Sequence, residues 1–383
     1  MTQQTISILG ATGSIGDSTL DLVLAHPDKF KVGALTAGQN VEKLAALCRQ
    51  HQPAFVAIED ESRYGELQAA VAGLPVETAC GAEGILAAAA YPADRVMAAI
   101  TGFAGLAPTL EAVKQGKIVM LANKECLVSA GELFMQSVAA SGCTVLPVDS
   151  EHNALYQLLD GHAIDDVKTL TLTASGGPFL NHTAEQLADV TAEMAVKHPV
   201  WSMGAKISID SATLINKGLE LIEARYLFPV DPAQLTVLIH PQSIIHALVT
   251  MHDGSVLAQM GTPDMRIPIA YCLGWPSRLP SRVDELDLVA LGQLSFEAPD
   301  ERRFPCLALA RQAMLAGHAM PTVLNAANEI AVAGFQNGQL SFVQIPGLIE
   351  KAMEKMQSAR ISGLEDVFSL DAETRDFCRN LLK

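Results

Sequence analysis

The stretch Thr5-Ile6-Ser7-Ile8-Leu9-Gly10-Ala11-Thr12-Gly13-Ser14-Ile15-Gly16 decides the fold of the N-terminal part of the chain. Its first five residues predict a buried strand, and a helix is predicted to follow through residues 18–25. Between the two, the glycines at positions 10, 13 and 16 give a GxxGxxG spacing, a variant of the dinucleotide-binding fingerprint. Such glycines let the backbone turn tightly and approach a pyrophosphate, which then meets the amide-rich start of the helix. The alternative is a tight strand-to-helix turn that binds nothing.

The alternation of strand and helix continues along the N-terminal third. Further strands are predicted at residues 30–35, 54–58, 95–100 and 117–121. This regular rhythm is typical of a doubly wound, Rossmann-like parallel sheet. Because such sheets bind ligands at the carboxyl ends of their strands, site residues are expected there.

The turn after the second strand, which contains Gly38, Gln39 and Asn40, bears on the choice of cofactor. An NAD-specific site carries an acidic residue near this position to bind the ribose hydroxyls, and this turn has none. The sequence therefore favours NADP. The turn has no arginine either, so it offers a phosphate only amides and the start of a helix.

Lys124 follows the strand predicted at residues 117–121 and is placed to enter the crevice at its carboxyl end. There it could reach a phosphate or a substrate hydroxyl. The alternative is a helix start, with Glu125 on the helix dipole and Lys124 in solvent.

Two carboxylates lie in the segment Pro147-Val148-Asp149-Ser150-Glu151-His152-Asn153, which leads into a helix predicted over residues 154–159. Side chains two positions apart on an extended segment point the same way, so Asp149 and Glu151 would face one spot. Two hard oxygen ligands there would form half of a divalent cation site. The alternative is an acidic helix start, with Asp149 or Ser150 as the cap and Glu151 on the dipole.

A second polar group of residues lies between Ser211 and Glu220. A helix is expected to begin near Ser211, and Asn216, Lys217 and Glu220 would then share one of its faces. Glu220 could complete a three-carboxylate cation site, while Ser211, Asn216 and Lys217 hold a phosphate nearby. The alternative is a surface helix with a Lys217–Glu220 ion pair. Gly218, which costs about 1 kcal/mol relative to alanine inside a helix, indicates close approach by another group.

Two loops in the middle third are further candidates. The turn at Ser175-Gly176-Gly177 follows a half-exposed strand predicted over residues 168–173. It offers a hydroxyl and unencumbered amides to an anion, and a plain turn is the alternative. The segment 197–204 places a histidine, a tryptophan and a methionine on a loop bracketed by proline and glycine, which indicates a lid that closes over ligand and excludes water. The alternative is a loop whose Trp201 packs into the core.

The expected organisation is α/β in the N-terminal part, α+β in the middle and helical at the end. Residues 1–148 would form the cofactor-binding domain, and residues 149–274 a catalytic domain whose open sheet could pair across a two-fold axis to form a dimer. Residues 275–300 are predicted to be a linker, and residues 301–383 a C-terminal helical bundle. The polar residues of LNAANE (324–329) are interpreted there as packing or caps, and histidines 240, 246 and 252 as structural.

Composition excludes several classes of protein. The 383 residues carry a formal net charge of -16, which argues against nucleic acid or an anionic membrane as the principal partner. Seven scattered cysteines form no CxxC pair and favour a reducing compartment. The N-terminus has no signal-peptide pattern and no window approaches 18 apolar residues, so a cytoplasmic location is predicted.

Taken together, the motifs resemble the 1-deoxy-D-xylulose 5-phosphate reductoisomerase family, whose members make 2-C-methyl-D-erythritol 4-phosphate in the non-mevalonate isoprenoid route. The resemblance runs nearly end to end and rests on GATGSIG (10–16), ANKE (122–125), VDSEHNA (148–154), SGGPF (175–179), HPVWSMG (198–204), KISIDSATLINKGLE (206–220) and LNAANE (324–329).

The resemblance implies a homodimer with NADPH as hydride donor and Mg²⁺ or Mn²⁺ as cofactor. The implied metal ligands are Asp149, Glu151 and Glu220. The implied catalytic residues are Lys124, Glu151 and His198, and a lid would carry His198, Trp201 and Met203. Substrate contacts are implied for Ser150, Glu151, Ser175, His198, Ser211, Asn216, Lys217 and Glu220. Cofactor contacts are implied for Thr12, Gly13, Ser14, Ile15, Gly38, Gln39, Asn40, Asn123, Lys124, Glu125 and Gly204. The main departure is Gln39, where relatives often have a basic residue.

The chemistry that these residues support agrees with the resemblance. A metal chelated by a ketone oxygen and the adjacent hydroxyl would stabilise oxyanions during a skeletal rearrangement, and hydride would then reduce the resulting aldehyde. Two alternatives are an ordinary NADP-dependent dehydrogenase of a phosphorylated sugar or amino acid and a non-catalytic nucleotide sensor. The first needs no metal triad, and the second needs no polar cluster like that between Ser211 and Glu220.

Overall fold

The computed structural model describes residues 3–201 and 203–383, which fall into two compact units. The first unit comprises the chain up to Cys126 together with Phe134–Ser150 and Met265–Val283. The second comprises Leu127–Leu133, Glu151–Asp264 and Asp284–Lys383. Helix α6 (Glu125–Ser141) contributes to both, and its backbone leaves helical geometry at Ala130.

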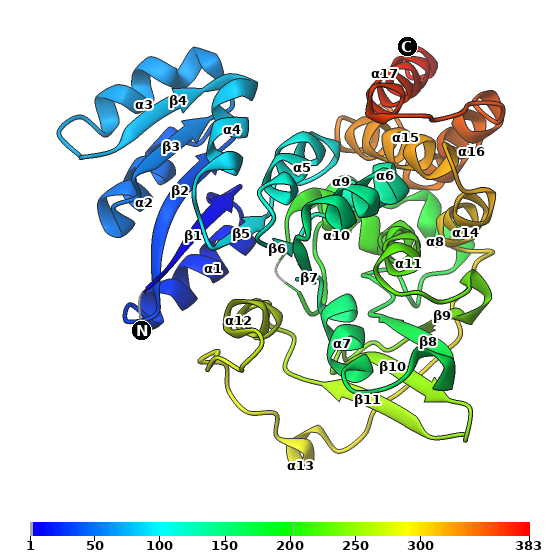
Figure 1. Ribbon diagram of the computed structural model, residues 1–383. Helices are drawn as coiled ribbons and strands as arrows, with labels where there is room; N and C mark the ends of the chain where they lie inside the picture. The colour runs from blue at the N-terminus through cyan, green and yellow to red at the C-terminus, as the bar shows by residue number, and fades with distance from the viewer. Residues whose placement is uncertain (1–2, 202) are drawn as a thin grey trace. The chain divides into compact units, whose positions relative to one another are not determined.

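The first unit is built on a seven-stranded sheet in which all neighbouring strands are parallel (Figure 1). The strand order is β4-β3-β2-β1-β5-β6-β7, so the direction of winding reverses at β1. Ligands of such sheets bind at this reversal, outside the carboxyl ends of the strands. The strands are Gln4–Leu9 (β1), Phe30–Ala37 (β2), Phe55–Ile58 (β3), Glu77–Cys80 (β4), Arg95–Ala98 (β5), Ile118–Leu121 (β6) and Thr144–Pro147 (β7).

Amphipathic helices accompany this sheet. Helix α4 packs on β1, β2 and β3, and helix α1 packs against α12. The helices are Ser14–Ala25 (α1), Val41–His51 (α2), Tyr64–Ala70 (α3), Gly81–Ala90 (α4), Leu106–Lys114 (α5) and Arg266–Gly274 (α12). Short 3-10 turns lie at Glu61–Arg63 and Phe103–Gly105. The parallel sheet with accompanying helices is the architecture predicted for the N-terminal part, but strand β4 was not among the predicted strands.

The second unit contains a four-stranded mixed sheet with the order β11-β10-β8-β9. The strands are Val167–Ala174 (β8), Leu235–Ile239 (β9), Ile245–Met251 (β10) and Val256–Met260 (β11), and only β8 and β9 run parallel. Helices of this part are Ser150–Leu159 (α7), Ala184–Ala188 (α8), Ala192–Ala195 (α9), Ala205–Ala212 (α10) and Ile215–Leu227 (α11), with 3-10 turns at Ile164–Asp166 and Pro232–Gln234.

The expectation of a half-exposed strand over residues 168–173 is wrong. Strand β8 lies between two neighbours, and its threonines at 171 and 173 are buried. Their hydroxyls are satisfied inside the protein, because Thr171 bonds Thr236 at 2.7 Å and Thr173 donates to the Ile245 carbonyl at 2.6 Å. The polar–apolar alternation therefore reflects internal hydrogen bonding and not exposure.

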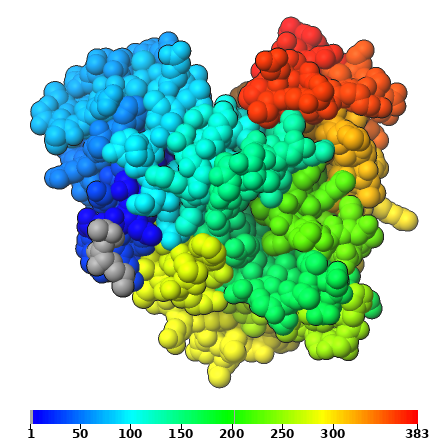
Figure 2. All heavy atoms as spheres, viewed as in Figure 1, coloured from blue at the N-terminus to red at the C-terminus, as the bar shows by residue number. Residues whose placement is uncertain are grey.

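The C-terminal helices pack into the second unit, where they share one hydrophobic core with α10 and α11. They are Cys306–Ala316 (α14), Met320–Gln336 (α15), Ile345–Lys355 (α16) and Leu364–Leu381 (α17), preceded by α13 (Leu288–Leu291) and with a 3-10 turn at Phe342–Gln344. Figure 2 shows the outer surface of α15 to α17 in orange and red. The helices are as predicted, but they do not form a compact unit apart from residues 151–264.

The segment expected to be a linker, residues 275–300, divides between the two units. Its first part follows α12, and both are fastened by Arg95, whose guanidinium donates to the carbonyls of Cys272 at 3.1 Å and Trp275 at 2.7 Å. The peptide bond between Trp275 and Pro276 is cis. These bonds explain why Met265–Val283 belongs with the first unit although it is distant in sequence.

Candidate active site

A cleft lies at the carboxyl ends of β1, β2 and β5 in the first unit. Sequence reasoning did not indicate its contributions from Thr36, Glu59 and Ile85, which come from positions outside the glycine motif. The cleft is lined by Gly10, Thr12, Gly13, Thr36, Ala37, Gly38, Glu59, Ile85, Ala99, Ile100 and Thr101.

Two of the three motif glycines are required by the backbone. A Cβ atom at Gly10, whose φ is +85°, would lie 2.6 Å from the Ala99 carbonyl oxygen, and one at Gly16 would lie 2.3 Å from that of Ala11. Gly13 has room for a side chain, but it lies in the cleft wall directly before α1. The close turn and the helix start therefore have the backbone arrangement that the motif predicts.

The predicted cofactor residues of this unit fall into two groups. Thr12, Gly13 and Gly38 line the cleft. Ser14 and Ile15 begin α1, and Asn40 caps α2 by accepting a bond of 3.0 Å from the Lys43 amide.

Asn123 uses its side chain within the first unit. Its Nδ2 donates to the carbonyl of Gly102 at 2.9 Å and to that of Ile100, and its Oδ1 accepts from the Cys126 amide at 3.0 Å. These bonds tie the cleft-lining segment after β5 to the end of β6. Asn123 therefore fixes the position of that segment at the cleft.

Lys124 and Asp149 form an ion pair within the same unit. The Lys124 side chain is only 7% exposed, so the solvated alternative does not hold, and Glu125 begins α6 beside it. A buried ammonium needs a partner, because the cost of removing it from water is large. Asp149 provides that partner at the carboxyl edge of the sheet.

In the second unit, Glu151, Lys217 and Glu220 form a buried charge cluster. The Lys217 ammonium lies 2.7 Å from Oε1 of Glu151 and also pairs with Glu220. Glu151 and Glu220 each offer a carboxylate oxygen within 4.8 Å of the other, and one oxygen of Asp149, two residues before Glu151, lies within the same distance of Glu151. Asn216 donates to Oε1 of Glu220 at 2.5 Å. The predicted face of amide, ammonium and carboxylate is present.

Opposing effects act on the Lys217 ammonium. Burial favours the neutral amine and by itself lowers the pKa, but the carboxylates of Glu151 and Glu220 outweigh it and raise the pKa above the ordinary lysine value. The side chain is therefore a charged group that occupies the position between two acids. Carboxylate oxygens so placed are ligands of the kind that Mg²⁺ prefers.

Two local expectations about these segments are wrong. Glu151 lies in the first turn of α7, which begins at Ser150, so the segment around it is helical and not extended. Ser211 lies in the last turn of α10, and a separate helix, α11, begins at Ile215 after Leu214 takes a left-handed conformation with φ of +60°. The acidic helix start considered for Asp149 to Glu151 is thus the observed geometry, and it still directs Glu151 toward Glu220.

The turn at Ser175 meets the end of α10. Gly177 has φ of +70°, and a Cβ atom there would lie 2.8 Å from the Ser211 carbonyl oxygen. The absence of a side chain thus permits the turn and Ser211 to approach each other closely, as a shared anion site would need. Ser175 Oγ also accepts a bond of 3.2 Å from the Gly177 amide.

His198 is held as a neutral imidazole. Its Nδ1 accepts from the backbone amides of Val200 at 3.2 Å and Trp201 at 2.9 Å, which leaves the proton on Nε2, 2.8 Å from Ser175 Oγ. Burial lowers the pKa of His198 from 6.5 to about 4. At neutral pH His198 is therefore a hydrogen-bond donor linked to the predicted phosphate turn.

The segment expected to be a lid has no helix or strand in its described part, and Ser202 lies outside the described residues. Trp201 lies near His246 of β10, with 6.1 Å between ring centroids. His246 is buried, and burial lowers its pKa. Contact with this strand is the arrangement expected for a tryptophan that packs on the core. Gly204 immediately precedes α10.

Comparison with known proteins decides the family. Residues 6–131 match the sequence profile described as 1-deoxy-D-xylulose 5-phosphate reductoisomerase, and residues 145–228 and 260–377 match two profiles for its C-terminal domain. A relative of that name from Pseudomonas syringae pv. syringae (strain B728a) is 54% identical over 97% of this chain and 96% of its own length. Another, from Laribacter hongkongensis (strain HLHK9), is 51% identical over 97% of each chain. The chain belongs to the 1-deoxy-D-xylulose 5-phosphate reductoisomerase family.

Solved structures of this reductoisomerase family agree with the fold. The enzyme from Zymomonas mobilis in complex with NADPH superposes with a TM-score of 0.93 at 48% identity and covers all of both chains. A reductoisomerase in complex with NADPH, fosmidomycin and magnesium gives 0.95 at 43% identity, covering 99% of this chain and 98% of the other. The predicted fold class, family and class of enzyme are confirmed.

One buried pair of the reductoisomerase was missed by sequence reasoning. His152 Nε2 lies 2.9 Å from the Glu220 carbonyl oxygen, so it carries a proton, and Nδ1 lies 3.1 Å from Oε2 of Glu223. His152 and Glu223 are 0% and 1% exposed. The pair joins α7 to α11 and fixes the helix turns that carry Glu151 and Glu220. In the sequence, the one signal for His152 and Glu223 is that they lie close to the predicted metal ligands Glu151 and Glu220.

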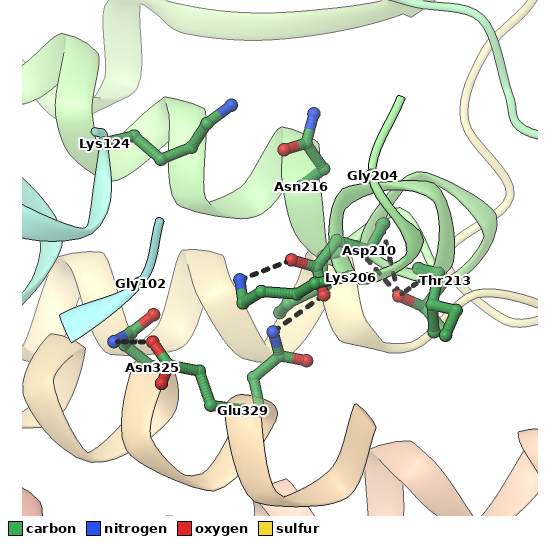
Figure 3. A network of polar contacts seen from close by, with 12 residues as sticks. Gly102, Lys124, Gly204, Lys206, Asp210, Thr213, Asn216, Asn325 and Glu329 are labelled. Atoms are coloured by element: carbon green, nitrogen blue, oxygen red, sulfur yellow. Dashed lines mark hydrogen bonds and ion pairs between the residues drawn. The ribbon is translucent and has the colours of Figure 1, made fainter. Parts of the chain in front are cut away.

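A second polar network fastens α10 to α15 (Figure 3). Asp210 is buried, and it pairs with Lys206 at 2.7 Å and accepts from Asn328 at 2.9 Å. Asn325 donates to Glu329 at 3.2 Å in the same helix. The interpretation of LNAANE as packing residues agrees with these bonds, which hold the helix that ends beside Ser211.

No helix among residues 3–201 and 203–383 is long and apolar enough to cross a membrane.

Proposed function

We propose that this reductoisomerase converts 1-deoxy-D-xylulose 5-phosphate to 2-C-methyl-D-erythritol 4-phosphate, using NADPH and a divalent cation held by Asp149, Glu151 and Glu220. The reaction is a step of non-mevalonate isoprenoid precursor synthesis. The observation that carries the site assignment is the convergence of Glu151 and Glu220 on the Lys217 ammonium. The cation is Mg²⁺ or Mn²⁺, and relatives whose structures contain magnesium support the first.

The carboxylates fit a metal of this kind. Glu151 and Glu220 supply hard oxygen atoms on two helices, and the buried pair of His152 and Glu223 keeps those helices in register. Because the Lys217 ammonium pairs with both acids, a cation bound there would displace it. Lys217 is then free to turn to the substrate phosphate, which is the role proposed for it.

The substrate phosphate is proposed to bind to Ser175, Ser211, Asn216 and Lys217. The first two approach each other through the packing of Gly177, and the last two share the start of α11. His198 keeps the Ser175 hydroxyl oriented, since its Nε2 is the donor of their bond. Contacts at the phosphate, far from the reacting carbons, orient the substrate for the rearrangement. Ser150, at the start of α7, is assigned a further substrate contact.

NADPH is proposed to bind in the cleft of the first unit, with its pyrophosphate at Thr12 to Ile15 and its adenosine end at Gly38 to Asn40. Further contacts are assigned to Asn123, Glu125 and Gly204. When bound, the metal polarises the ketone and hydroxyl oxygens of the substrate, and NADPH supplies the hydride that reduces the aldehyde. Lys124, released from Asp149, donates a hydrogen bond to a substrate oxygen.

The segment that carries His198, Trp201 and Met203 is proposed to act as a lid. It has no regular secondary structure in its described part, and it leads directly into α10. Closure of a loop that carries large apolar side chains would exclude water from the reactive intermediate.

A homodimer in the cytoplasm is the proposed state of the protein. Strand β11 is an edge strand whose Val256 and Met260 are 57% and 37% exposed, a feature that a second copy would cover. All seven cysteines are free thiols, as in a reducing compartment. Light scattering coupled to gel filtration gives the oligomeric state directly, and a monomeric mass at micromolar concentration would exclude the dimer.

The reaction is tested by the loss of NADPH absorbance with 1-deoxy-D-xylulose 5-phosphate, with and without EDTA. We expect oxidation of NADPH with Mg²⁺ present and none after chelation. Turnover that survives EDTA would point instead to a dehydrogenase that needs no metal. Cofactor binding without oxidation would point to a nucleotide sensor.

A further inference from the structure

We infer that Lys43 binds the 2′-phosphate of NADPH and so sets the preference of this enzyme for NADPH over NADH. This inference rests on the proposed use of NADPH. The turn at residues 38–40 provides no positive charge for that phosphate, since position 39 is glutamine. Among residues 36–43, Lys43 is the one basic residue.

The Lys43 side chain reaches from α2 to the glycine loop. Its Nζ donates to the Thr12 carbonyl oxygen at 3.0 Å and lies 2.7 Å from Oδ2 of Asp17. Thr12 lines the cleft, so the ammonium is bonded to the backbone of a cleft-lining residue. The Lys43 side chain is 35% exposed, which leaves donor capacity for a ligand beyond these two bonds.

The position of the ammonium agrees with how dinucleotides lie on such sheets. The pyrophosphate binds at the glycine loop, and the adenosine ribose binds at the end of the second strand. Thr12 belongs to the first of these elements, and Gly38 follows the second. The Lys43 side chain is bonded to the glycine loop, and its backbone lies in α2, a few residues after the end of β2. A phosphate on the ribose would therefore lie between the glycine loop, the turn after β2 and the Lys43 side chain.

The charges around this space explain why a cation is needed. A phosphate monoester carries about two negative charges at neutral pH. Two acidic groups lie beside this region: Asp17 on α1, which pairs with Lys43, and Glu59, whose Oε2 would lie 3.6 Å from a Cβ atom at Gly38. These carboxylates tolerate the ribose hydroxyls of NADH but repel the extra phosphate of NADPH. Lys43 is the group able to reverse that balance.

Direct binding separates this inference from the catalytic assignment. Calorimetric titrations of the full-length enzyme would use NADPH and NADH, and also adenosine 2′,5′-bisphosphate and 5′-AMP as fragments. For Lys43→Gln we expect about tenfold weaker binding of NADPH and of the bisphosphate, with NADH and 5′-AMP unchanged, because a charge-assisted hydrogen bond is lost. Lys43→Arg should retain the preference. Asp17→Asn, which removes a competing anion, should strengthen NADPH binding.

Lys31→Gln is the matched control, because Lys31 is exposed near the start of β2, at the opposite end of that parallel strand. It removes the same charge from the same unit and should leave all four affinities unchanged. Equal weakening of NADPH and NADH by Lys43→Gln, or no change in either, would overturn the inference. Wild-type enzyme that binds adenosine 2′,5′-bisphosphate and 5′-AMP equally would also overturn it. Failure of the proposed reaction would show separately, as absent turnover by an enzyme that still discriminates between the two fragments.

Discussion

The ammonium of Lys217 lies 2.7 Å from Oε1 of Glu151, although 66 positions separate the two residues in the chain. Lys217 also pairs with Glu220 one turn further along α11. All three side chains are largely or wholly buried, so removal of the ammonium leaves two neighbouring carboxylates without the positive charge between them. In the proposed site a divalent cation and this ammonium would compete for the same two carboxylates, and that competition would link metal binding to phosphate binding.

Lys217→Ala is expected to have two measurable effects. The KM for substrate should rise about tenfold, because a charge-assisted contact to phosphate is lost. The metal-free enzyme should lose about 3–5 kcal/mol of unfolding free energy, since two neighbouring carboxylates lose the ammonium that lies between them. Mg²⁺ should then stabilise the variant more than the wild type, because no ammonium has to be displaced. Chemical denaturation at several Mg²⁺ concentrations measures this difference, and an equal metal response in both proteins would remove Lys217 from the metal site.

Glu220→Gln is expected to abolish turnover while NADPH affinity stays nearly unchanged. The amide retains the size of the side chain but loses the charge that binds the cation, and a loss of at least about 100-fold in kcat is expected. Steady-state kinetics over a range of Mg²⁺ and a separate NADPH titration check both parts. Glu193→Gln, at a side chain that is 82% exposed, is the matched control. Normal turnover by Glu220→Gln at modest metal would refute the cation site.

Protonation of His198 is expected to destabilise the fold in acid. Burial lowers the pKa of His198 to about 4, while the unfolded chain has the ordinary value near 6.5. Between these values the unfolded state binds a proton that the native state does not. The free energy of unfolding therefore falls as the pH drops from 6.5 toward 4, and above pH 6.5 this proton causes no loss of stability. Urea unfolding at pH 7.5 and pH 5 should show a larger loss for wild type than for His198→Gln. Equal losses would mean that His198 titrates normally in the native state.

The sequence predicted those features of the site that depend on local spacing. The glycine motif predicted the strand, turn and helix, and Gly16 is demanded by its backbone contact with Ala11 inside that motif. Gly10 is demanded instead by the backbone of Ala99, which lies far along the chain. The shared face of Asn216, Lys217 and Glu220 followed from helical periodicity alone. Such features are set by residues a few positions apart, and sequence patterns record them directly.

Features set by distant contacts were not predictable in the same way. The bond from Lys217 to Glu151 and the pair of His152 and Glu223 arise only when α7 meets α11. The burial of β8 depends on its two neighbouring strands, which no pattern in residues 168–173 reveals. The split of residues 275–300 likewise depends on Arg95, far earlier in the chain.

Gly218 shows how one residue joins a local signal to a distant contact. A glycine inside a helix indicated close approach, and the approaching group is α14, because a Cβ atom at Gly218 would lie 2.3 Å from that of Ala310. Gly218→Ala should therefore destabilise the enzyme by about 1–3 kcal/mol through overpacking, despite the better helix propensity of alanine. Gly347→Ala, in helix α16 where a Cβ atom meets no neighbour, is the matched control and should be neutral or stabilising.

The double variant Gly218→Ala with Ala310→Gly tests whether this contact is the cause. Moving the methyl group from α14 to α11 removes the clash, so the double variant should be more stable than the sum of the two single changes predicts. Because α11 also carries Lys217 and Glu220, the single Gly218→Ala change should shift both and lower kcat, and the double variant should recover part of that activity. Additive losses of stability, with no recovery of kcat, would show that the two residues act independently and that α14 does not position the charge cluster.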